Sequence, residues 1–188
     1  MPQTKILVDT CSYFRLAQNI HPLLAVAFGK ADYTLYAHEA LTKEFERTAR
    51  LQNKFDWFTQ PDYVANRSRP LMIGRKEDKA IETTFEFMWE HVRAENLKPS
   101  PVDVRILATA SELSLRMVSD DQDLLAMAKA YGVHADTSLE LMRLMMDEKH
   151  IDKAKVRQVV AQWKNDNDKP AKFADDYRRL FGEMPPKE

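Results

Sequence analysis

The feature that most constrains the fold is an alternation between short runs of strand-forming residues and amphipathic helical segments. Four-residue runs of this kind occur at 5–8, 33–36 and 115–118, and short apolar runs are typical of buried strands in parallel sheets. Helical patterns separate them at residues 10–17, 103–114, 122–131 and 138–147, and a last short strand is expected at 133–135. The alternation predicts an α/β fold with a parallel sheet, in which the helices form right-handed crossovers between strands.

The segment between the second and third strands carries less regular patterns. Residues 22–28 and 39–58 each predict a single helix, residues 59–74 a loop, and residues 76–96 a long amphipathic helix. These elements are expected to form the crossover that returns the chain to the sheet.

The end of the chain predicts a helical extension. Gly132 stands where a left-handed C-cap is expected after a helix. Two further helices with apolar faces are predicted within residues 147–188, next to a domain formed by residues 1–146. Because these faces are apolar, we expect the extension to dock on the domain or on a second subunit.

Composition excludes several classes of protein. The 188 residues are 44% hydrophobic and 30% charged, which is typical of a globular chain and not of a disordered one. The longest apolar run, at 23–28, is far shorter than the roughly 20 residues that a membrane span needs. The lone Cys11 excludes an internal disulfide and a zinc–thiolate cluster, and is expected to be a small buried residue. With no visible export signal, these features predict a cytoplasmic protein with no membrane contact.

Acidic residues concentrate where strands end and helices begin. The net charge is −1 overall, but residues 99–148 hold nine acidic and four basic groups. Because the carboxyl ends of parallel strands meet at one edge of a sheet, we expect these acids to converge there: Asp9, Glu44, Asp103, Asp120, Asp121 and Asp123. Converging carboxylates repel one another, and a hard divalent cation such as Mg²⁺ or Mn²⁺ relieves that repulsion. A metal held in this way activates water for phosphodiester hydrolysis.

Each acid also has a purely structural interpretation. Asp9 and Asp121 stand where N-caps are expected, and Ser100 with Asp103 fits a capping box around Pro101. Glu44 fits an ordinary exposed helical position. Since helix starts attract acids in any case, only the combination of all of them favours a metal site.

Four segments, taken in order, resemble the PIN domain, a family of metal-dependent ribonucleases. They are Ile6–Thr10, Leu41–Phe45, Asp103–Ala110 and Met117–Leu124, within a resemblance that covers roughly residues 4–146. The resemblance implies a PIN-like three-layer fold with a central parallel sheet flanked by helices, an acidic pocket that binds Mg²⁺ or Mn²⁺, and cleavage of single-stranded or loop RNA.

The resemblance also assigns roles by position. It implies four catalytic acids, Asp9, Glu44, Asp103 and Asp121, and a metal set of Asp9, Asp103, Asp121 and Asp123. Thr10, Ser119 and Asp120 are implied to support the pocket. Because Asp120 and Asp121 are adjacent, either could be the fourth acid of the family, although the spacing from Ser119 favours Asp121.

RNA binding requires cations around an acidic pocket, because backbone affinity comes from neutralising phosphates. The candidate contacts are Arg67, Arg69, Lys76, Arg105 and Arg116. The sequence thus predicts a Mg²⁺- or Mn²⁺-dependent endoribonuclease. A toxin that an antitoxin protein inhibits, a defence or housekeeping ribonuclease, and a homodimer all remain open. The alternative is a PIN-like scaffold that binds RNA or protein without catalysis.

Overall fold

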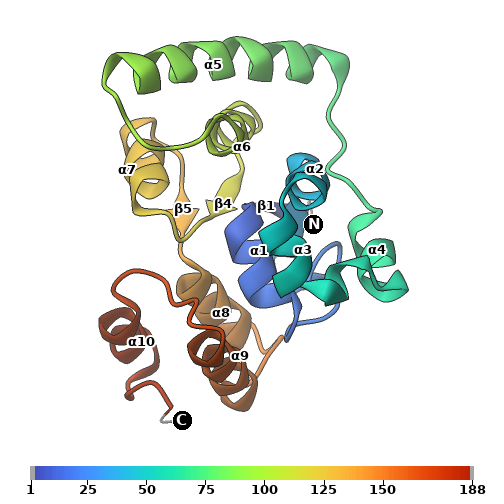
Figure 1. Ribbon diagram of the computed structural model, residues 1–188, viewed down its shortest axis with the longest axis vertical. Helices are drawn as coiled ribbons and strands as arrows, with labels where there is room; N and C mark the ends of the chain where they lie inside the picture. Colours follow the sequence, from blue (N-terminus) through green and yellow to red (C-terminus); the bar gives the residue numbers. More distant parts are fainter. Residues whose placement is uncertain (1–2, 187–188) are drawn as a thin grey trace.

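The central sheet of the protein has five strands. The computed structural model describes residues 3–186, and its strand order is β2-β3-β1-β4-β5 (Figure 1). Four strands are parallel: β1 (Thr4–Val8), β3 (Tyr33–Ala37), β4 (Arg116–Val118) and β5 (Ala135–Asp136). The edge strand β2 (Ala27–Phe28) pairs antiparallel with β3. The predicted α/β fold, with a mostly parallel sheet between helices, is confirmed.

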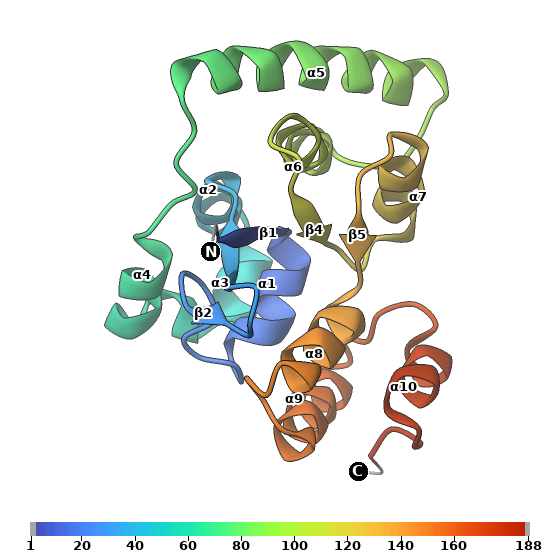
Figure 2. The same cartoon turned by 180° about the vertical axis from the view of Figure 1, so that it is seen from behind.

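Helices cover both faces of this sheet, as the two views show (Figures 1 and 2). One face carries α1 (Thr10–Ala17), α8 (Ser138–Asp147), α9 (Lys153–Asn165) and α10 (Phe173–Phe181). The other carries α6 (Pro101–Glu112), α7 (Gln122–Ala130) and the outermost helix, α5 (Arg75–Ala94). The connection between β3 and α5 contains α2 (Ala40–Arg47), α3 (Ala49–Lys54), the 3-10 turn η1 (Asp56–Thr59) and α4 (Pro61–Arg67).

Alternation along β1 divides the core in two. Ile6 and Val8 belong to the hydrophobic cluster beneath α1 and α8, whereas Leu7 belongs to the cluster beneath α6 and α7. All three side chains are at most 1% exposed. A strand that is apolar on both faces must be covered on both, which explains the three layers of the fold.

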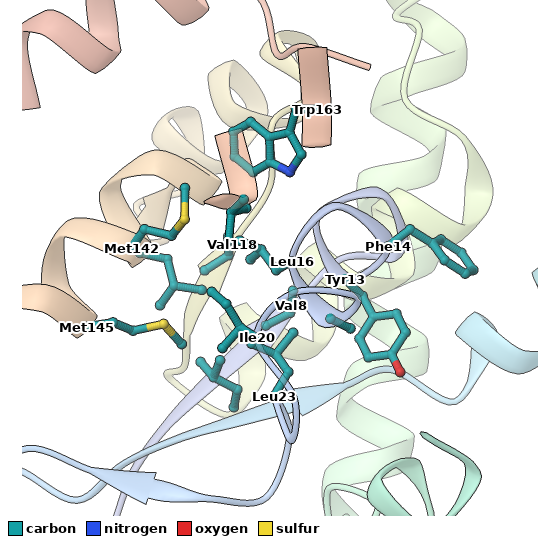
Figure 3. Close-up of a cluster of buried hydrophobic side chains, with 14 of the residues drawn as sticks. Val8, Tyr13, Phe14, Leu16, Ile20, Leu23, Val118, Met142, Met145 and Trp163 are labelled. Carbon is teal, nitrogen blue, oxygen red and sulfur yellow. The ribbon is translucent and has the colours of Figure 1, made fainter. Parts of the chain in front are cut away.

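The C-terminal helices share the first cluster. Trp163, Phe173 and Tyr177 are buried among the same residues as Val118 of β4. Figure 3 shows the Trp163 ring next to Val118 and Leu16. The extension therefore packs on the sheet's helical layer, as its apolar faces predict; the division of the chain at residue 147 stays a prediction.

The helix predicted over 22–28 is wrong. Leu24 is held in an irregular conformation by Asn66 of α4, whose amide accepts from the Leu24 N–H at 3.0 Å and donates to its carbonyl at 2.6 Å. Ala25, at φ 55°, donates to the carbonyl of Leu35 at 2.9 Å, and the chain then enters β2. Long-range hydrogen bonds to the backbone thus replace the local ones of a helix.

The single helix predicted over 39–58 is also wrong. Thr48 has extended backbone angles (φ −118°, ψ 94°), so that the chain turns between α2 and α3 and again before η1. These turns place Phe45, Phe55 and Phe58 around Phe14, with the Phe55 ring stacked on it at 4.5 Å. Similarly, the predicted loop at 59–74 contains α4.

Other sequence predictions are confirmed. The amphipathic helix predicted at 76–96 is α5, and Gly132 adopts a left-handed conformation (φ 70°) after α7. Among residues 3–186, no helix has both the length and the apolar character to cross a membrane.

Candidate functional site

The carboxyl ends of the parallel strands define one edge of the sheet. Asp9 follows β1 and donates its N–H to the carbonyl of Val118 at 3.0 Å; Ser119 follows β4 and donates to that of Asp136 at 2.9 Å. The helix α6 leads back into β4, so its first turn, with Asp103, lies at this same edge. We call the carboxylates of Asp9, Glu44, Asp103 and Asp121 at this edge the acidic edge.

Asp9 is the most strongly perturbed of these acids. Its side chain caps α1 by accepting the Ser12 N–H at 2.6 Å, and the residue is only 3% exposed. Burial raises the pKa of Asp9 to about 6, although hydrogen bonds from Ser119 and Ser12 act in the opposite direction, and the neighbouring charge of Asp120 raises it further. A buried carboxylate of this kind is stabilised by any cation that comes close to it.

Ser119 connects two acids of the acidic edge. Its fully buried hydroxyl accepts the N–H of Asp121 at 3.1 Å and donates toward the carboxylate of Asp9, where it lowers the pKa. Thr10, predicted as another supporting residue, is the first residue of α1 and is 7% exposed. The Ser119 hydroxyl thus ties the start of α7 to the end of β1.

Asp103 and Asp121 act as helix caps, as their structural interpretation predicts. Asp103 Oδ2 accepts the N–H of Ser100 at 2.9 Å and its hydroxyl at 2.7 Å, while Asp121 Oδ1 accepts the N–H groups of Asp123 and Leu124 at 2.8 and 2.9 Å. Within the described part of the chain, the other carboxylate oxygen of each accepts no hydrogen bond. Capping therefore fixes both side chains and leaves one oxygen of each available.

Cys11 reports how close three of the acids are to one another. Its pKa is raised to about 12 by the protein around the thiol and by the negative charges of Asp9, Glu44 and Asp103. These three carboxylates, from the end of β1, from α2 and from α6, thus act on a single side chain. The expectation that Cys11 is buried is wrong, because the residue is exposed. A thiol with this pKa is no nucleophile at neutral pH.

The acids do not form a complete metal site in this conformation. Over residues 3–186, no three His, Cys, Asp or Glu side chains are close enough together to hold one ion. The donors nevertheless suit a hard cation, since they are carboxylate oxygens and the most buried of them has a raised pKa. Asp123 is exposed and lines a separate pocket of about 320 Å³ with His91 and Lys98.

Asp120 has a different role from its neighbour Asp121. Its side chain, 1% exposed, points into the protein and accepts from Arg15 Nη1 at 2.9 Å and from the N–H and hydroxyl of Ser138 at 2.9 and 2.7 Å. Asp121 is the exposed member of the doublet. The geometry therefore favours Asp121 as the acid that faces solvent, in agreement with its spacing from Ser119.

Sequence reasoning missed the cation that compensates Asp120. Arg15 pairs with it and also with Asp168 of the C-terminal extension, at 2.8 Å. Nothing in the local sequence marks the pairing of Arg15 with Asp168, because these two residues are 153 positions apart.

Three of the five predicted RNA contacts line one cavity beside the acidic edge. Arg67, Arg69 and Arg105 border a space of about 620 Å³ between α2, residues 67–73 and α6. The guanidinium of Arg105 is bound by Glu82 at 2.8 Å and lies over Phe85 at 4.3 Å. Arg69 is exposed, and Arg67 lies over the Phe58 ring at 3.4 Å. Two of these three arginines, Arg67 and Arg105, are thus held in place by neighbouring side chains.

The remaining two contacts lie elsewhere. Lys76 is exposed in the first turn of α5 and is not among the residues that line the cavity. The expectation that Arg116 lies near the acidic edge is wrong, because it begins β4 at the amino end of the sheet. There its guanidinium is bound by Asp136, with Nη2 at 2.8 Å from Oδ1. Arg116 instead lines a cavity at the amino end of the sheet, with Thr4 and Lys5 of β1.

Comparison with known proteins gives a partial likeness in fold. The sequence matches no family profile and no curated protein. The crystal structure of FitAcB from Neisseria gonorrhoeae is similar over 71% of this chain and 97% of the other, with a TM-score of 0.43 and 14% sequence identity. At that score nothing about function follows, so the chemistry is inferred from this chain's own side chains.

Proposed function

We propose that the protein is a Mg²⁺- or Mn²⁺-dependent endoribonuclease whose active site is the acidic edge. The observation that carries this proposal is the buried carboxylate of Asp9, whose pKa is raised to about 6, at the strand ends of a mostly parallel sheet, together with Glu44 and Asp103, whose charges act with that of Asp9 on the Cys11 thiol. Ligands of open α/β sheets bind at that edge, and paired carboxylates there suit a divalent cation.

The residues would share the work as follows. Asp9, Asp103 and Asp121 would bind the cation, with Asp123 as an outer ligand on the same helix as Asp121. A divalent cation at such a site supplies an activated water and neutralises charge on the scissile phosphate. Glu44 of α2 would accept a proton from the attacking water, since its charge acts on the same thiol as those of Asp9 and Asp103.

The chain's own hydrogen bonds would hold this arrangement. Ser119 keeps Asp9 and the start of α7 together, and the caps on Asp103 and Asp121 fix one oxygen of each. To share an ion, the acids of α6 and α7 would have to approach Asp9, because among residues 3–186 no three possible ligands are close enough together. The cationic lining of the cavity beside them would bind the RNA backbone, through Arg69 above all, because its side chain is exposed.

The test is metal-dependent cleavage of RNA by the full chain. We expect a labelled single-stranded RNA, but not the matching DNA, to be cut with Mg²⁺ or Mn²⁺ and to stay intact with a chelator. Asp103→Asn should abolish cleavage. Asp175→Asn is the matched control, because Asp175, like Asp103, is an acid in the first turn of its helix, and it lies exposed on α10.

Metal binding is measured separately by calorimetric titration with Mn²⁺. Binding that disappears in Asp103→Asn but persists in Asp175→Asn supports the proposal. RNA binding without cleavage at any metal concentration contradicts it and favours the non-catalytic scaffold. An inhibitory antitoxin and a homodimer stay predictions from the family resemblance.

A further inference from the structure

A chain of ion pairs runs from the C-terminal extension to the acidic edge. The guanidinium of Arg15, in the last turn of α1, donates from Nη1 to Asp120 Oδ2 at 2.9 Å. Its other side donates from Nη2 and Nε to Asp168 Oδ1 at 2.8 and 3.2 Å. Lys54 of α3 binds the second oxygen of Asp168 at 2.7 Å. Two acids and two bases thus alternate, and their formal charges cancel.

The extension also holds the backbone of Arg15. The indole Nε1 of Trp163 in α9 donates to the Arg15 carbonyl at 2.7 Å, and Trp163 is only 2% exposed. This ring packs against Val118, the last residue before the turn that carries Ser119 and Asp120 (Figure 3). The extension therefore fixes Arg15 at two points: Asp168 binds its guanidinium and Trp163 binds its carbonyl.

Asp120 passes this constraint to the acidic edge. It stands between Ser119, which binds Asp9, and Asp121, which caps α7. Its buried carboxylate depends on Arg15 for a compensating charge, because an unpaired charge in a protein interior is strongly unfavourable. The position of the turn over 119–121 depends on that pair.

We propose that Arg15 and Asp168 are positioning residues, through which the C-terminal extension holds the 119–121 turn and so sets the spacing of Asp9 and Asp121. The catalytic consequence rests on the proposed function; the positioning itself does not. Neither residue touches substrate, and both act through Asp120. The extension is in this sense a part of the site, although none of its residues lies at the acidic edge.

The shape of arginine makes the proposal testable. A planar guanidinium binds two carboxylates at once with fixed angles, whereas an ammonium group is a compact point charge. Arg15→Lys should therefore keep a charge near Asp120 while losing the bridge to Asp168, and Arg15→Gln should lose both. We therefore expect Arg15→Gln to disturb the position of the 119–121 turn more than Arg15→Lys does.

The experiment compares Asp168→Ala, Arg15→Gln and Arg15→Lys in the full chain. Glu183→Ala is the matched control: it breaks the ion pairs of the extension with Lys153 and Arg157 but touches nothing near the turn. Three quantities are measured: amide hydrogen exchange at Asp121 and Ser138, the Mn²⁺ concentration for half-saturation, and kcat and KM for RNA cleavage.

We expect Asp168→Ala to accelerate exchange at both amides, with Mn²⁺ affinity and kcat reduced about tenfold and KM nearly unchanged, the scale known for groups that orient metal ligands. Arg15→Lys should recover part of what Arg15→Gln loses, and Glu183→Ala should leave all three quantities as in the wild type. Equal effects of Asp168→Ala and Glu183→Ala on the amides, or no effect of either, would overturn the proposal. If the wild-type chain neither binds Mn²⁺ nor cleaves RNA, the proposed function fails, and the amide exchange alone decides the positioning.

Discussion

Replacing Asp9 with asparagine should stabilise the folded protein, and the gain should depend on pH. The pKa of Asp9 is raised from 3.8 to about 6 because the carboxylate is buried. The folded state therefore holds this proton more tightly than the unfolded chain does. Stability from this group is fully present below pH 3.8 and is lost as the pH rises through about 6.

The magnitude follows from the shift. A difference of roughly two pKa units corresponds to ~3 kcal/mol of unfolding free energy at neutral pH. Asparagine removes this term without removing the cap, because Asn and Asp are about equally good at the N-cap position. The Asn side chain can also keep a hydrogen bond to Ser119. Its NH₂ group would donate to the Ser119 hydroxyl oxygen, which has two lone pairs and uses only one of them to accept from the Asp121 N–H.

The assay is urea unfolding of the wild type and Asp9→Asn, followed by tryptophan fluorescence without divalent metal. Above pH 6 we expect the variant to be more stable by about 2–3 kcal/mol, or roughly 5–10 °C in Tm for a chain of this length. Near pH 4 the two proteins should be almost equal. Asp9→Ala separates the two effects, since it also removes the charge but loses a cap that contributes about 1 kcal/mol.

Two results would refute this reasoning. One is an Asn variant no more stable than the wild type above pH 6; the other is a gain of the same size at every pH. Added Mn²⁺ gives a second check, because it should stabilise the wild type and leave Asp9→Asn nearly unchanged if Asp9 binds the metal.

Three further outcomes are expected. Phe14→Ala should cost about 3–5 kcal/mol in urea unfolding, because Phe14 is 3% exposed and lies among five aromatic rings. Asn66→Ala should cost about 1–3 kcal/mol and speed amide exchange at Leu24, whose two backbone groups it leaves unpaired. Alkylation of Cys11 should be slow at neutral pH and accelerate about tenfold for each unit of pH up to its pKa of about 12, despite the exposure of the residue; a plateau near pH 9 would contradict the raised pKa.

Sequence predicted residues 101–147 better than the connecting segments within residues 22–59, for a physical reason. Between residues 101 and 147, caps, helix propensity and apolar periodicity all agree, so local signals alone determine the elements. Between residues 22 and 59 these local signals do not determine the connecting segments. There the backbone follows Asn66 and the aromatic cluster around Phe14, partners that no local window contains.

The same distinction holds at the site. Strand ends in a parallel sheet lie at one edge whatever the details, so the grouping of Asp9 with Asp103 and Asp121 follows from topology. The direction in which a side chain points does not follow from the topology. Arg116 is predicted as an RNA contact near the acids, but it stands at the start of β4, at the other end of that strand.

Capping and metal binding are not competing explanations of the acidic edge. A cap occupies one carboxylate oxygen and orients the other, which is a favourable starting point for a ligand. Capping alone, however, does not account for Asp9. Asparagine or serine caps a helix about as well without placing a negative charge in a site that is 3% exposed, where ionisation costs about 3 kcal/mol at neutral pH. A bound cation offsets that cost, and the stability difference between the wild type and Asp9→Asn, measured with and without Mn²⁺, shows directly whether it does.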